Sequence, residues 1–237
     1  VSLKINALPD TSTPTKPTDK DGVSDAIENA VQSLPTTNGL TVVGDGNGDG
    51  VADSLQSNVT SVPFLNTTTA QSNPGSAPPV YVTLVADSQN GKVDPAATSP
   101  ASLANVKQLD APTDKPADLS MPLGLISFSS SVFTAGGAES FSLYVDSSLA
   151  VNGYWKKTSA GSWVNLASSE YGGKVVTEGG KTRLDFKVTD GGQFDADGKA
   201  DGVITDPGAP GYRTVANASD SDNDQFPDSL EAANGLT

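Results

Sequence analysis

The sequence predicts a mainly β protein: an antiparallel β-sandwich preceded by a short pair of loop–helix units. Two patterns carry this prediction. After residue 80, about eight short strand-like segments, two of them with clear alternation of apolar and polar side chains, are separated by Gly- and Ser-rich turns, a spacing typical of sandwiches. Before residue 63, apolar side chains instead recur every three or four positions, as they do on one face of a helix.

The chain is expected to begin with a linker followed by two small units. Residues 1–18 are rich in Thr and Pro, which is typical of a linker. Residues 19–63 are predicted to hold two loop–helix units, one ending at Pro35 and the other at Pro63. Their helical positions are Val23, Ile27, Ala30, Val31 and Leu34, and then Val51, Leu55, Val59 and Val62. Helices this short are unstable alone in water, so we expect them to pack on each other or on a neighbouring sheet.

Residues 64–216 form the predicted sandwich. Its expected strands are residues 81–85, 123–128, 140–145, 153–157, 163–166, 174–177, 183–188 and 202–205. Six aromatic side chains are predicted to belong mostly to the core: Phe128, Phe133, Phe141, Trp155, Trp163 and Phe186. Lys156 and Lys157 are expected at a solvated strand end, and Asp206-Pro207 is expected in a turn.

The composition excludes several kinds of chemistry. The 237 residues include no Cys and no His, which removes disulfides, thiol catalysis, zinc–thiolate sites and His-based acid–base catalysis. The formal charge of −14 argues against nucleic acid or an anionic membrane as a partner. The segment has no run of apolar residues long enough to predict a membrane span. It begins at Val1 without a signal peptide, and we interpret it as a piece of a longer exported protein.

The acidic side chains are clustered in loops, which favours metal binding over a role in solubility. In residues 45–56, side-chain oxygens fall at loop positions 1, 3, 5, 9 and 12, with Gly50 at position 6. This is the spacing of a calcium loop, because Ca²⁺ takes about six to eight oxygen ligands and the glycine permits the sharp turn that gathers them. The same frame fits residues 17–28, with Pro17 at position 1, and residues 220–231, with Gln225 at the glycine position. The N-terminal pair is therefore predicted to be a calcium loop–helix pair.

Several Ca²⁺ ions are expected. The predicted ligands are Asp19, Asp21, Asp25, Glu28, Asp45, Asn47, Asp49, Asp53, Asp190, Asp195, Asp197, Asp201, Asp206, Asp220, Asp222, Asp224, Asp228 and Glu231. The run at residues 190–206 has a different spacing and follows a strand. It is expected to hold at least one ion at one end of the sandwich, chiefly through Asp195, Asp197 and Asp201. An acidic turn that needs no metal is the alternative for this run.

Several motifs follow one another in the order of a known family. They are residues 122–128, 154–156, 163, 188–192, 195–198, 201–204 and 206–208. In this order they resemble the choice-of-anchor U domain of bacterial surface proteins, over residues 120–211. The family more often has Asn where Asp201 stands, and both residues supply oxygen. The Asp- and Gly-rich loops resemble thrombospondin type 3 calcium repeats and, more loosely, dockerin loops. The resemblance implies a cell-surface or secreted protein of the adhesin kind, and no enzymatic activity.

The sequence therefore favours a calcium-binding structural module that extends a large bacterial cell-surface or secreted adhesin-like protein. Its expected partners are neighbouring modules of the same chain and a cell-surface sugar or protein. Residues 217–237, a calcium loop and helix that echo residues 19–28, are predicted to begin a next repeat. The alternative is a ligand-binding adhesion module that holds a sugar or protein, with ligand residues that the sequence does not mark. An enzyme is not expected, because the sequence contains no recognisable nucleophile–base pair.

Overall fold

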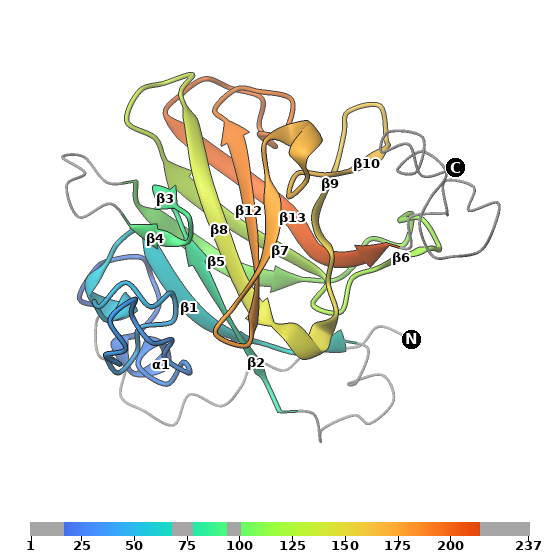
Figure 1. The fold of residues 1–237 in the computed structure, drawn as a ribbon. Helices are drawn as coiled ribbons and strands as arrows, with labels where there is room; N and C mark the ends of the chain where they lie inside the picture. Colours follow the sequence, from blue (N-terminus) through green and yellow to red (C-terminus); the bar gives the residue numbers. More distant parts are fainter. Residues whose placement is uncertain (1–16, 68–77, 94–100, 214–237) are drawn as a thin grey trace, which may run out of the picture.

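The computed structural model describes residues 17–67, 78–93 and 101–213 (Figure 1). Its first sheet contains β1 (Val59–Phe64), β2 (Val80–Val85), β8 (Ala138–Asp146), β11 (Lys174–Glu178) and β12 (Lys181–Thr189). Its second sheet contains β5 (Leu103–Leu109), β6 (Leu119–Ser120), β7 (Leu125–Ser131), β9 (Gly153–Lys157), β10 (Trp163–Asn165) and β13 (Val203–Arg213). A small hairpin joins β3 (Ser88–Gln89) to β4 (Lys92–Val93). The helical turns are α1 (Asp25–Glu28), η1 (Asp53–Leu55), η2 (Ser147–Leu149) and η3 (Ser169–Tyr171).

The two sheets confirm the predicted antiparallel, mainly β fold. The first sheet has the strand order β1-β2-β8-β12-β11, and the second has the order β10-β9-β13-β7-β5, with β6 pairing β13. Aromatic rings from the two sheets meet in the core. Phe128 of β7 lies 5.1 Å from Phe141 of β8, and Tyr154 of β9 stacks on Phe186 of β12 at 3.8 Å between ring centroids. The inward-facing positions of alternating strands thus fill one shared core.

All eight expected strand segments contain a strand, but β13 corrects one prediction. It continues through Asp206 and Pro207, which pair with Phe128 and Ser127 of β7, so the expected turn at this dipeptide is wrong. Pro207 pairs with β7 on one side, and pairing of β13 with β9 on the other side begins only at Ala209. A strand accommodates proline where one side of its backbone is unpaired. Strands β1, β3, β4, β5 and β6 were not expected.

The second predicted helix is also wrong. Residues 53–55 form a single turn of 3₁₀-helix, and Val59–Phe64 is the edge strand β1, paired with β2. The apolar spacing of this segment fits a helix, yet tertiary packing overrides it because β1 is covered on both faces. Val62 and Phe64 join the main core, whereas Val59 packs with Leu34 and Tyr144 under the N-terminal loops. The sandwich therefore begins before residue 64, and the first predicted helix shrinks to the four residues of α1.

Two other expectations about burial are wrong. Phe133 is 81% exposed and does not belong to the core, and Trp155 is only half-buried. Lys156 is buried inside the sandwich instead of lying at a solvated end, while Lys157 is exposed as expected. Most of the predicted linker and the whole of residues 217–237 lie outside the described residues. Within the described ranges, no helix is both long and apolar enough to cross a membrane.

Candidate metal centre

Three acidic side chains of the N-terminal unit converge beside the edge strand β1. Ligand oxygens of Asp19, Asp21 and Glu28 all lie within 4.8 Å of one another, and this is the only such group of three in the part of the chain that is described. The turn before α1 makes this possible, because Lys20 and Gly22 adopt left-handed backbone conformations, with φ of 73° and 100°. The chain thereby reverses within a few residues and directs Asp19, Asp21 and Glu28 to one point.

Hydrogen bonds fasten the cluster to β1. Asp21 accepts the backbone N–H of Val23 at 2.7 Å through one oxygen and the hydroxyl of Thr60 at 2.6 Å through the other. Glu28 accepts the backbone N–H of Ser61 through Oε1 at 3.3 Å. The acidic cluster therefore joins the N-terminal unit, both the loop before α1 and α1 itself, to the outermost strand of the first sheet.

Two oxygens of this cluster are buried without a hydrogen-bond partner in the described structure: Oδ2 of Asp19 and Oε2 of Glu28. The whole side chain of Glu28 is inaccessible to solvent. Burial, reinforced by the charges of Asp21 and Asp19, raises the pKa of Glu28 to about 9. Burial also raises the pKa of Asp19 to about 7. A cation bound by these oxygens would supply the partners that they lack and remove the repulsion between them, so the residues fit a hard metal ion.

Asp25 and Asp53, which the sequence also assigns to calcium, are placed differently. Asp25 accepts the backbone N–H and the hydroxyl of Thr18, at 2.8 and 2.6 Å, and lies outside the cluster. Asp53 is buried in η1, where it accepts the N–H of Gly46 and the hydroxyl of Ser61. Burial raises the pKa of Asp53 to about 8, and its charge acts in turn on Glu28. Asp53 therefore borders the cluster through Ser61.

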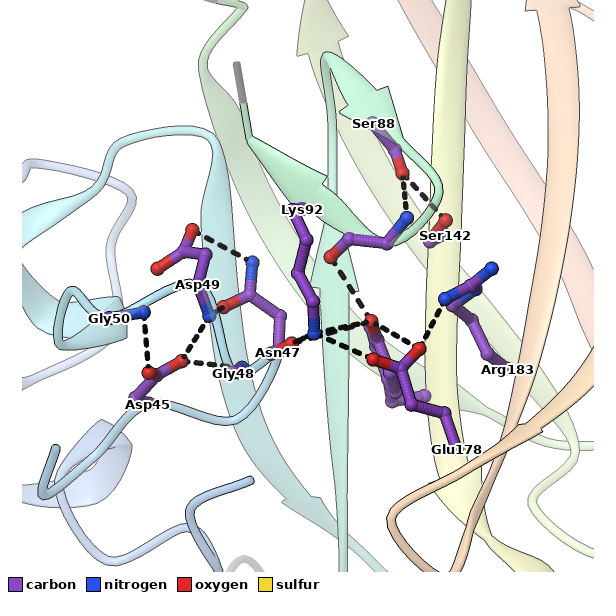
Figure 2. A network of polar contacts seen from close by, with 12 residues as sticks. Asp45, Asn47, Gly48, Asp49, Gly50, Ser88, Lys92, Ser142, Glu178 and Arg183 are labelled. Carbon is purple, nitrogen blue, oxygen red and sulfur yellow. Dashed lines mark hydrogen bonds and ion pairs between the residues drawn. The ribbon is translucent and has the colours of Figure 1, made fainter. Parts of the chain in front are cut away.

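The loop at residues 45–56 closes as the predicted frame requires, but only in part (Figure 2). Asp45 accepts three backbone N–H groups, those of Gly48, Asp49 and Gly50, at 2.6, 3.1 and 2.8 Å. The amides of Asn47 and Gln56 donate to one oxygen of Asp49, at 3.0 and 2.9 Å. The side chains at positions 3 and 12, Asn47 and Gln56, thus meet at the carboxylate of position 5. The side chain at position 9, Asp53, instead accepts the hydroxyl of Ser61.

A lysine from the hairpin holds this loop against the first sheet. Lys92 of β4 donates to the backbone oxygen of Asn47 and forms an ion pair with Glu178 of β11 at 2.7 Å. Glu178 also pairs with Arg183 of β12, as Figure 2 shows. The loop is therefore anchored to the sandwich through its backbone, while the carboxylates of Asp45 and Asp49 bind groups of their own loop.

In the run at residues 190–206, the first two acids bind backbone groups. Oδ2 of Asp190 accepts the N–H groups of Gly136 and Gly202, at 2.7 and 2.8 Å. Asp195 accepts the N–H groups of Gly191 and Thr205, at 2.8 and 2.9 Å. The hydrogen bond from Gly136 is the main reason that the pKa of Asp190 is lowered. These carboxylates tie the turn after β12 to the start of β13.

The remaining acids of this run do not form a shared site with Asp195. Asp197 and Asp201 are exposed, and each accepts the N–H two residues ahead, at 2.9 and 3.1 Å. Asp206 is fully buried in β13, where it pairs with Lys156 and accepts the hydroxyl of Tyr154. Its assignment to a calcium shell is therefore wrong, because a buried ammonium already neutralises it. Of the other four acids, Asp190 has one buried oxygen, Oδ1, without a hydrogen-bond partner in the described structure, but no three of these acids come together there, which favours the acidic turn that needs no metal.

Asp220, Asp222, Asp224, Asp228 and Glu231 lie outside the described residues, so their predicted site stays a prediction. Sequence analysis missed Thr60 and Ser61, whose hydroxyl and N–H groups hold the cluster acids. Both are fully buried on a strand that was interpreted as a helix. No local signal marks them, because two polar residues between Val59 and Val62 also fit the polar face of an amphipathic helix.

Comparison with protein-family models, with curated proteins and with solved structures finds no match to this chain. The resemblance to choice-of-anchor U domains therefore rests on the sequence motifs alone. Function is accordingly argued from the chemistry of the acidic cluster.

Proposed function

We propose that this protein is a calcium-binding structural module whose ion fastens the N-terminal unit to the edge of the β-sandwich. The observation that supports this most directly is the carboxylate of Glu28, which is fully buried and carries an oxygen without a hydrogen-bond partner in the described residues. It lies with two more acids, and none of the ion pairs among the described residues involves any of these three. Buried charges are retained in proteins when they are paired or bind a metal.

The donor set favours a hard divalent cation. All three candidate ligands offer carboxylate oxygen, and the chain has no Cys or His to select a softer metal. Ca²⁺ accepts irregular oxygen shells more readily than Mg²⁺, which demands near-octahedral geometry. Ca²⁺ is therefore the ion that we assign, with Asp19, Asp21 and Glu28 as ligands.

The ion would act as a fastener. Its ligands hydrogen-bond to Thr60 and Ser61 of β1, the edge strand of the first sheet. An uncovered edge strand pairs readily with other chains, so a cover that is held by an ion protects it. In a bacterial cell-surface or secreted protein built of neighbouring modules, the same fastening would stiffen the segment that enters the sandwich. This is the extender role that we propose.

Calorimetric titration of the metal-free protein with Ca²⁺ tests the proposal. We expect Glu28→Gln to remove one binding event and Glu170→Gln to remove none, because Glu170 is exposed on η3, away from the cluster. An equal number of bound ions in both variants would contradict the assignment. Retained binding of other ions in Glu28→Gln would locate those ions in another loop.

A ligand-binding adhesion module is the second candidate, and one observation favours it. Phe133 is 81% exposed and borders a groove of about 440 Å³ whose lining includes Asp87 and Glu139. Exposed aromatic rings beside acidic groups can bind sugars through stacking and hydrogen bonds. Screening against a panel of glycans supports this candidate if the wild type binds and Phe133→Ala does not. It is the weaker candidate because Phe133 is the one aromatic ring among the described lining residues.

A further inference from the structure

A lysine and an aspartate lie together in the centre of the sandwich, away from the acidic cluster. Lys156 of β9 is 3% exposed and Asp206 of β13 is fully buried. Apolar side chains flank Asp206, whereas Lys156 also borders a cavity lined in part by Asp195. Asp206 lies opposite Phe128 in the pairing with β7, and two residues away from the buried Ile204. Long charged side chains are rarely buried to this extent unless they are paired.

The register of the strands brings the two side chains to the same face. Trp155 pairs with Ala209, so Lys156 lies opposite Gly208, two residues along β13 from Asp206. Residues two apart on a strand face the same side, which makes Lys156 and Asp206 diagonal neighbours. Gly208 leaves room for the Tyr154 ring, because a Cβ there would come within 2.5 Å of that ring.

The two oxygens of Asp206 have different partners. Oδ1 forms the ion pair with Nζ of Lys156, and Oδ2 accepts the hydroxyl of Tyr154. The Tyr154 ring is itself held by stacking on Phe186, with an angle of 8° between the two rings. Tyr154 thus holds one oxygen of the carboxylate while the other oxygen contacts the amine nitrogen, one bond away from the carboxyl carbon. The geometry orients a nucleophile, a carbonyl carbon and a stabilising donor at one point.

Burial favours the uncharged form of this pair. It lowers the pKa of Lys156 to about 7, against the opposing charge of Asp195. In an apolar core, transfer of one proton from the ammonium to Oδ1 converts two costly charges into a neutral amine and a neutral acid. A neutral primary amine is a nucleophile, and a neutral carboxylic acid can lose its hydroxyl group.

We propose that Lys156 and Asp206 condense to an intramolecular amide bond that cross-links β9 to β13. After the proton transfer, the lone pair of Nζ attacks Cγ of Asp206, and the C=O electron pair moves onto Oδ2, where Tyr154 stabilises it. A second Nζ proton passes to the Oδ1 hydroxyl, which leaves as water when the Cγ–Oδ1 bond breaks and Oδ2 reforms the carbonyl. The ammonium and carboxylate thereby become one secondary amide and one water molecule, with no oxidant or external reagent.

The surroundings allow the product to leave. A cavity of about 280 Å³ borders the amine end of the pair and would give the released water a route out; its lining includes Lys156, Asp195 and Trp163. The cross-link closes the chain between residues 156 and 206 and ties the last strand of the sandwich to β9. Since the chain contains no Cys, such a bond would take the place of a disulfide as a covalent support. It is independent of the calcium proposal.

Intact-mass measurement of the denatured wild-type chain tests the proposal. We expect a mass lower than the sequence value by one water molecule. Proteolytic digestion should release a branched peptide that joins Lys156 to Asp206, and fragmentation should locate the bond. A wild-type chain with the full sequence mass and no branched peptide overturns the proposal and leaves a buried ion pair. Because this measurement uses only the wild type, it stands even if a variant fails to fold.

Two variants provide the controls. Lys156→Met should restore the full sequence mass, whereas Lys157→Met should retain the loss of water, because Lys157 is exposed and pairs with Asp114 on the surface. Asp-Gly sequences can also lose water by forming a cyclic imide. An imide would still form in Lys156→Met, and mild alkali would hydrolyse it and restore the full mass. A loss of water that persists in Lys156→Met, or that mild alkali reverses in the wild type, would count against the cross-link.

Discussion

Replacing Glu28 with glutamine is predicted to change stability in opposite directions with and without calcium. The substitution keeps the shape of the side chain and an oxygen that can accept the N–H of Ser61. It removes the ionisable acid. In the metal-free protein at pH 7 the raised pKa keeps this acid protonated beside Asp19 and Asp21, whereas in the calcium-bound protein its carboxylate would be a ligand.

The raised pKa of Glu28 sets the size of the stability change in the metal-free protein. Burial, with the charges of Asp21 and Asp19, raises the pKa of Glu28 from 4.5 to about 9. The folded state therefore holds this proton more tightly than the unfolded state, so stability falls as pH rises from about 4.5 to about 9. Each pH unit above the unfolded value of 4.5 costs about 1.4 kcal/mol, so at pH 7 the acid destabilises the fold by up to about 3.5 kcal/mol. Glutamine avoids this cost and should stabilise the metal-free protein by up to that amount.

Calcium reverses the difference. Binding to the native state alone stabilises it by about 4.1 kcal/mol at a thousandfold excess over Kd. The wild type should gain this stabilisation and the variant should lose most of it, so the wild type becomes the more stable protein at high calcium. Urea unfolding at pH 7, in chelator and in calcium, measures both differences, with Glu170→Gln as the control. A variant that is destabilised in chelator, or that responds to calcium like the wild type, would refute the assignment of Glu28.

Three further predictions concern the sandwich. Burial raises the pKa of Glu139 to about 7, which favours its acid form in the folded state. The free energy of unfolding should therefore fall as pH rises from about 4.5 to 7, and Glu139→Gln should flatten that part of the curve. Phe186→Ala should cost about 3–5 kcal/mol in urea unfolding and Phe133→Ala almost nothing, because only the first ring is buried; equal costs would show that the core is misassigned. Gly91→Ala should lower the melting temperature much more than Gly161→Ala: both residues have φ near 90°, but a Cβ at Gly91 meets a buried tyrosine hydroxyl and one at Gly161 meets nothing within 4 Å.

Much of the fold could be predicted from local patterns. Strands β8 and β12 follow from alternating side chains, since a strand directs successive residues to opposite faces whatever its partner. The clustering of acids in Gly-rich loops was likewise visible, and Gly22 and Gly50 do adopt the left-handed conformations that tight turns require. These features depend on neighbours in the sequence, and local periodicity therefore identified them.

Local patterns failed where two interpretations fit the same residues. The spacing of Val59 and Val62 fits a helical face as well as a strand. Packing of Val62 in the main core and of Val59 under the N-terminal loops stabilises the strand. The calcium frame at residues 17–28 likewise includes Asp25, but its bonds to Thr18 remove it from the acidic cluster. Spacing along the chain lists possible ligands, and competing hydrogen bonds select among them.

The sequence by itself determined the fold class, the acidic loops and the absence of thiol and imidazole chemistry. Only the tertiary structure decided which charges meet. Lys156 and Asp206 lie far apart in the sequence and were assigned to a solvated end and a turn, yet the register of β9 against β13 places both on one buried face. Register is set by the packing of the whole core, because a shift of one residue would turn every side chain to the opposite face. No local pattern in this chain carries that information.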